Sequence, residues 1–118
     1  MASTLYNRRG TPVAYVRGST FYLFSGEPVA YLHGKSIYAF SGKHLGHLIS
    51  GWVCDNRGGC VLFTKGARGG PNRPETASDP PRAATLPTPV KVRREAKRDA
   101  PSEPAKWSRL SVERFFNR

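Results

Sequence analysis

A sixteen-residue repeat runs through the first half of the chain and restricts its fold more than any other feature. Tyr22-x-Phe24-Ser25-Gly26 is followed sixteen residues later by Tyr38-x-Phe40-Ser41-Gly42. Extending the comparison gives four copies, which start at Tyr6, Tyr22, Tyr38 and Cys54. A period of this length is too short for a helix pair or a leucine-rich unit. It suits a β-hairpin with two strands of about five residues each. The repeat therefore predicts four consecutive β-hairpins.

The turn chemistry within each copy predicts how its two strands pair. Segments such as Asn7-Arg8-Arg9-Gly10 are typical of a three-residue hairpin loop that ends in a left-handed glycine. With that loop, Tyr6 faces Pro12 and Leu5 faces Val13. The second of these pairs is apolar in every copy, so we expect its face to form the core. The same face is expected to carry the equivalent residues Tyr15, Tyr31, His47 and Phe63.

Closure of the four hairpins into a ring is expected from the cost of leaving them open. A single hairpin is marginally stable in water, and an open row of hairpins exposes a bare sheet edge at each end. So short a domain also has little core, and closure adds to it. We therefore expect an all-β fold in which residues 1–68 form a shallow pseudo-four-fold barrel.

The motif Tyr22-x-x-x-Gly26-x-Pro28-Val29-Ala30-Tyr31-x-x-Gly34, its four copies and the polar tail resemble the 4-fold beta flower family of bacterial proteins. The resemblance covers roughly residues 4–70 and implies a rosette of β-hairpins, but no catalytic activity. The fourth copy departs from the pattern with Cys54 and Cys60, and the third has Ser50 in place of glycine. The symmetry is therefore expected to be imperfect at these positions.

The composition changes after the repeats. Residues 67–118 hold eight of the ten prolines and twelve of the nineteen basic residues. Residues 69–105 combine low hydrophobicity with frequent proline and charge, which predicts a disordered linker. The run Lys91-Val92-Arg93-Arg94 and the pair Lys97-Arg98 form a basic cluster. This cluster either contacts nucleic acid or anionic lipid, or serves as a solvated spacer.

Residues 106–118 are expected to form an amphipathic docking peptide. Ser111 is a good N-cap for a helical turn, and Leu110 and Phe115 have the spacing of a hydrophobic staple. A turn of this length is unstable on its own, and its exposed aromatic residues need cover. The peptide is expected to dock on its own barrel, on another subunit or partner, or on nothing, through Trp107, Leu110, Phe115 and Phe116.

Two candidate sites follow from the repeat, and each has a structural alternative. The first site consists of four core-face residues, Tyr15, Tyr31, His47 and Phe63. Four-fold symmetry could gather them around a small aromatic pocket, or they could simply plug the barrel. His44, Cys54 and Cys60 share the other face and are a conceivable zinc site. The alternatives are a reversible disulfide and two reduced, buried thiols.

These features favour a non-enzymatic binding or scaffold module with a C-terminal docking peptide. The net charge of +11 supports an alternative, a protein that binds nucleic acid or an anionic membrane. The repeats contain only two carboxylates, Glu27 and Asp55, both in or near turns, so we expect no catalytic residues and no cofactor. With no export signal and no transmembrane segment expected, the chain is predicted to be cytoplasmic.

Overall fold

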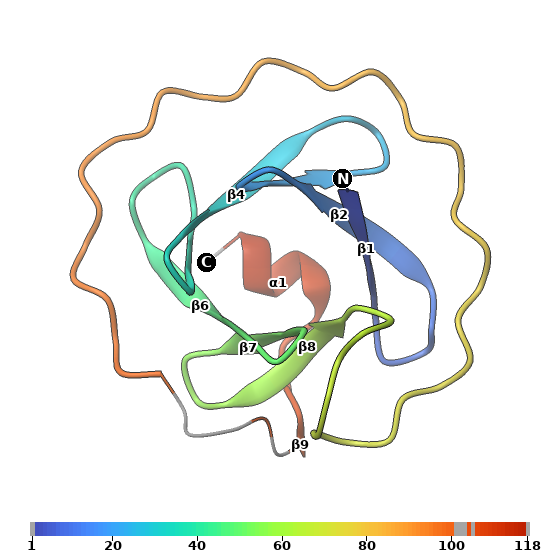
Figure 1. The fold of residues 1–118 in the computed structure, drawn as a ribbon. Coiled ribbons are helices and arrows are strands. Elements are labelled where there is room, and N and C mark those ends of the chain that lie inside the picture. The colour runs from blue at the N-terminus through green and yellow to red at the C-terminus, as the bar shows by residue number, and fades with distance from the viewer. Residues whose placement is uncertain (1, 101–103, 105, 118) are drawn as a thin grey trace.

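The computed structural model describes residues 2–100, 104 and 106–117, and among these eight antiparallel strands form one sheet in chain order. The strands are β1 (Ala2–Tyr6), β2 (Pro12–Arg17), β3 (Thr20–Leu23), β4 (Pro28–His33), β5 (Ser36–Tyr38), β6 (His44–Ile49), β7 (Trp52–Asp55) and β8 (Gly59–Phe63). Tyr6 of β1 pairs with Phe63 of β8, which closes the sheet into a barrel (Figure 1). The predicted ring of four hairpins, β1–β2 to β7–β8, is confirmed.

The expected hairpin turns are present in all four copies. The amide of Gly10 donates to the carbonyl of Asn7 at 2.9 Å, and the equivalent glycines make the same bond in the other copies. Gly10 and Gly42 have φ angles of 82° and 94°, in the left-handed region that side chains disfavour. The recurring turn glycine is therefore required by the backbone conformation of the loop.

Half of the expected strand register is confirmed and half is wrong. Tyr6 faces Pro12 as predicted, but Leu5 faces Ala14, because Val13 is an extra residue on its strand. The same one-residue shift occurs in the other three hairpins. Such a bulge bends the strand and increases its twist, which helps a small sheet to close. A straight ladder extrapolated from the turn omits this bend.

The bulges decide which side chains face the barrel interior. On the bulged strands two consecutive residues, such as Val61 and Leu62, join the same core. The next residue then turns outward, so Tyr15 and its equivalents do not share the core face as expected. The interior holds Leu5, Ala14, Phe21, Ala30, Ile37, Leu45, Val53, Val61 and Leu62, together with Phe115 and Phe116.

The centre of the ring is filled by a helix that comes late in the chain. A two-residue strand, β9 (Lys106–Trp107), pairs parallel with β8 and leads into α1 (Val112–Phe116), which lies inside the ring (Figure 1). The predicted helical turn is confirmed, and the Ser111 hydroxyl caps it by accepting from the Arg114 amide at 3.2 Å. Phe115 is completely buried and Phe116 is 6% exposed.

The segment expected to be a disordered linker has neither helix nor strand over residues 69–100, but it stays on the barrel. Residues 71–100, here called the belt, encircle the outer surface (Figure 1). The amides of Ala77, Leu86 and Glu95 donate to the carbonyls of the successive turn glycines Gly10, Gly26 and Gly42. The belt therefore advances nine residues for every sixteen-residue hairpin.

The nine-residue step of the belt matches the dimensions of the ring. Nine residues of an extended, proline-rich chain span roughly 28 Å at about 3.1 Å per residue. The molecule is 36 Å across, so this span is about one quarter of its circumference. A chain with frequent prolines can keep this extended path without internal hydrogen bonds, since its amides reach the turn carbonyls instead.

Candidate functional site

Cationic side chains of the belt cover tyrosines on the outside of the barrel. The Arg82 guanidinium lies 4.1 Å from the Tyr15 ring centroid, and the Lys91 ammonium lies 4.5 Å from that of Tyr31. These cations are nine residues apart and the tyrosines sixteen, as the path of the belt requires. Cation–π contacts of this kind contribute about 0.5–1 kcal/mol each at exposed sites. Part of the basic charge therefore serves to hold the belt in place.

The structure does not bring the four residues of the expected aromatic pocket together. Tyr15 packs on Tyr22 and Phe24, and Tyr31 makes the corresponding contacts one repeat later. Phe63 packs on Tyr6, Trp52 and Trp107, and His47 packs on His44. Each ring lies on the outer face of its own hairpin because the bulge has turned that position away from the axis.

Two histidines and a glutamate anchor the belt to the third hairpin. The His47 Nε2 donates to the Arg98 carbonyl at 3.0 Å, and the Arg98 amide donates to the His44 Nδ1 at 3.3 Å. The His44 amide donates to the Glu95 carboxylate at 2.7 Å. Pro12 and Pro28 occupy the place of His44 in the first two hairpins and have no amide hydrogen to satisfy. Glu95 therefore accepts a hydrogen bond from an amide that is present only where the repeat has a residue other than proline at this position.

The zinc candidates His44, Cys54 and Cys60 do not form a ligand cluster. Cys54 and Cys60 face each other across β7 and β8 as predicted, and both are buried and not joined by a disulfide. The residue opposite Cys54 on β6 is His47, not His44. Burial raises the pKa of the Cys54 thiol to about 12, with smaller contributions from Cys60 and Asp55. Within the part of the chain that the structure describes, no three metal-ligating side chains converge.

The expected docking residues lie on the protein's own barrel, at two different places. Trp107 covers the outside, with its ring centroid 5.4 Å from that of Trp52 and the Arg8 guanidinium 5.7 Å from its centroid. Leu110, Phe115 and Phe116 belong to the interior cluster. The Ser108 amide donates to the Cys60 carbonyl at 2.8 Å, which extends the pairing of β9 with β8. The sequence left three destinations open for this peptide, and in this structure it occupies the first of them, its own barrel.

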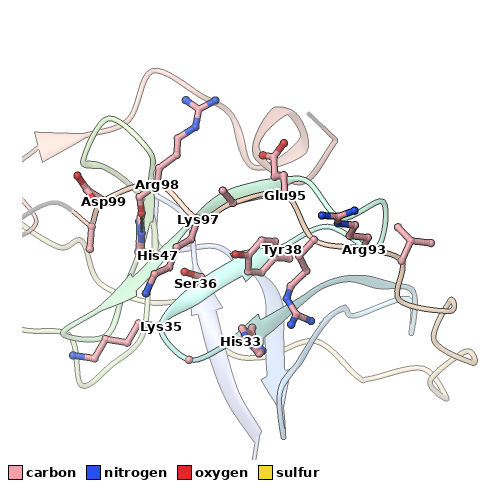
Figure 2. A pocket seen from close by; sticks show the side chains of 15 residues that line it. His33, Lys35, Ser36, Tyr38, His47, Arg93, Glu95, Lys97, Arg98 and Asp99 are labelled. Atoms are coloured by element: carbon pink, nitrogen blue, oxygen red, sulfur yellow. Dashed lines mark hydrogen bonds between the residues drawn. The ribbon is translucent and has the colours of Figure 1, made fainter.

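A basic cleft of about 840 Å³ lies between the third hairpin and the belt. Figure 2 shows Lys97 of the belt near His47 of the barrel, with Lys35 on the barrel side, Arg93 further along the belt and the Arg98 side chain directed away from Lys35. Five cationic side chains line the cleft, against two carboxylates: Lys35, Arg93, Arg94, Lys97 and Arg98, with Glu95 and Asp99. The cleft was not predictable from the sequence, because one wall belongs to a segment whose composition indicates disorder.

Within the part of the chain that the structure describes, no cation of the cleft has an ion-pair partner within 4 Å. Among the described residues, the ion pair within 4 Å is that of Arg82 with Asp79, at 3.8 Å and outside the cleft. Glu95, one of the two carboxylates in the lining, already accepts from the His44 amide. The arrangement can therefore attract and hold a negatively charged group by electrostatics and hydrogen bonding.

Comparison with known proteins settles the family. A family model described as "4-fold beta flower protein" matches residues 3–116. The chain belongs to the 4-fold beta flower family. The match includes the belt and α1, so it extends well past the region of residues 4–70 that carried the resemblance in the sequence. The family description names a fold and no activity. No curated protein and no solved structure matches this member of the beta flower family.

Among the described residues of this beta flower protein, no helix is long and apolar enough to cross a membrane.

Proposed function

We propose that this beta flower protein is a non-enzymatic binding module that takes an anionic ligand in the basic cleft. The observation that carries the proposal is the excess of cationic groups around a cleft of about 840 Å³, none of which forms an ion pair with another described residue. A negatively charged group in the cleft would lie among cations of both the barrel and the belt, including Lys35 and Lys97. Charge-assisted hydrogen bonds of this kind are about twice as strong as neutral ones.

The proposal gives the C-terminal docking peptide a structural role. Its apolar residues fill the barrel and cover the outer face near Trp52. A scaffold function through this peptide would require it to leave the barrel and expose Phe115, which is completely buried. The cleft needs no such rearrangement, and we therefore place ligand binding there. A cytoplasmic location remains part of the proposal and is consistent with two buried cysteines that form no disulfide.

The contacts of the aromatic residues favour a compact anion over nucleic acid as the ligand. Proteins that bind single strands stack bases on exposed aromatic rings. Here the rings near the cleft are already engaged, since Tyr31 lies under Lys91 and Tyr38 lies 5.7 Å from the Arg94 guanidinium. A phosphate-type group needs only the cations.

Calorimetric titration with inorganic pyrophosphate at about 50 mM salt tests the proposal. The double variant K35A/K97A should bind at least about tenfold more weakly than the natural protein. R9A/R57A removes the same charge from exposed residues outside the cleft and is the matched control. Equal losses in the two variants would indicate attraction by net charge alone and would overturn the proposal, as would the absence of binding by the natural protein.

A further inference from the structure

The large apolar side chains that remain exposed gather on one arc of the belt. Among the described residues these are Leu86, Val90 and Val92, with exposed fractions of 55%, 85% and 51%. All three fall within seven residues, whereas exposed apolar residues on proteins are usually scattered singly. The local geometry accounts for their direction. Lys91 points inward to Tyr31, so its neighbours on an extended chain point away from the barrel.

This arc is fixed in position. The Leu86 amide donates to the Gly26 carbonyl and the Glu95 amide donates to the Gly42 carbonyl, so the arc is anchored at two successive hairpins. Pro87 and Pro89 keep the intervening chain extended and prevent it from folding into a helix that would bury the apolar groups. The exposure of the three side chains is therefore built into the path of the belt.

The apolar arc continues directly into the basic cleft. Val92 is half exposed and also lines the cleft. Arg93, Lys97 and Arg98 follow it along the belt and also line the cleft. Aliphatic side chains beside a cluster of cations suit the interface of an anionic bilayer, where apolar groups enter the headgroup region and cations meet lipid phosphates.

We propose that residues 86–98 dock this protein on an anionic phospholipid surface. Leu86, Val90 and Val92 enter the interface, and a lipid phosphate occupies the basic cleft; the second part rests on the function proposed above. The small size of the patch favours a membrane over a folded protein partner, since a stable protein interface buries about 800 Å² on each side. Membrane attachment needs no such area, because each nearby cation adds its own attraction to anionic lipid.

The test is sedimentation with vesicles of phosphatidylcholine, with and without roughly 30% phosphatidylserine. The natural protein should bind only the anionic vesicles, and less as salt rises. L86S/V90S/V92S should reduce that binding at least about tenfold. L86S/V90S, which keeps the cleft residue Val92, should also bind vesicles more weakly and should leave the affinity for pyrophosphate unchanged. A77S/A83S/A84S, which changes three other belt residues to serine, is the matched control and should bind like the natural protein.

The outcomes separate this inference from the proposed function. Pyrophosphate binding without vesicle binding would overturn membrane docking and leave the proposed function standing. Vesicle binding that L86S/V90S/V92S retains in full would also overturn it, because charge alone would then explain attachment. Vesicle binding that K35A/K97A retains in full would remove the lipid phosphate from the cleft. Failure of both ligands to bind would overturn both proposals.

Discussion

Replacing Glu95 by alanine tests how the belt accommodates the third hairpin. The substitution removes the acceptor of the His44 amide, which now donates to the carboxylate at 2.7 Å. His44 is 1% exposed, so water cannot easily replace the lost acceptor. A buried donor left unsatisfied costs about 1–3 kcal/mol, and we expect E95A to lower the free energy of unfolding by that amount. E95Q keeps an acceptor oxygen and should cost less than about 1 kcal/mol.

A double-mutant cycle isolates this one contact. H44P gives the third hairpin the proline that the first two carry at this register, and removes the amide hydrogen altogether. H44P also removes the ring that accepts from the Arg98 amide, so it is destabilising by itself, but the cycle subtracts that loss. In the H44P background the cost of E95A should fall below about 0.5 kcal/mol.

Urea denaturation followed by tryptophan fluorescence measures each member of the cycle. Trp52 is buried and Trp107 is partly buried against it, so unfolding changes the surroundings of both. The four proteins should share one m-value, which makes their free energies comparable. If E95A costs as much with proline at position 44 as with histidine, the role assigned to the Glu95–His44 bond is refuted.

Three further predictions use the same measurement. F115A should lower the free energy of unfolding by about 3–5 kcal/mol, because it empties the centre of the barrel; a loss under about 1 kcal/mol would mean that the helix is not part of the core. G42A should destabilise more than G34A: both positions have positive φ, but only at Gly42 would the new methyl group collide with the belt, at the Arg93 carbonyl, and equal costs would contradict that contact. Because the Cys54 pKa is raised from 9.0 to about 12, the contribution of this thiol to stability should be constant below about pH 9 and decline between pH 9 and pH 12, where the unfolded thiol loses its proton before the folded one does; C54A should weaken this decline.

The barrel could be predicted from the sequence because the same local pattern of turn and apolar residues occurs in all four copies of the repeat. Turn glycines such as Gly10 and apolar positions such as Leu5 agree in every copy, and ring closure follows from the exposed edges. The bulge was missed because the register was extended from the turn as a straight ladder. A signal was present: Val13-Ala14 and Val61-Leu62 place two apolar residues in succession, where strict alternation requires only one.

The path of the belt was much harder to predict. Its composition is that of a disordered chain, and it is held by backbone hydrogen bonds and cation–π contacts that leave little hydrophobic signal. The nine-residue spacing of Arg82 and Lys91 is visible in the sequence, but it has meaning only once the circumference of the ring is known. The basic cleft depends on this path and was missed for the same reason.

The helical turn of the docking peptide was predictable, but its destination was not. Ser111, Leu110 and Phe115 show the cap and staple locally, within six residues. The space that receives Phe115 is set by side chains on strands from all four hairpins, and no local pattern reports its size. Hydrophobicity alone therefore identified a docking segment without choosing between its own barrel and a partner.

The position of α1 at the centre of the ring bears on the order of events during protein synthesis. A ribosome produces Phe115 and Phe116 only after every strand that surrounds them. Until then the nascent hairpins enclose an unfilled space, and their closing seam rests on one residue pair, Tyr6 with Phe63. Close packing is needed for a unique native state. Vectorial synthesis can thus yield the hairpins one by one, but the ring becomes rigid only when α1 arrives.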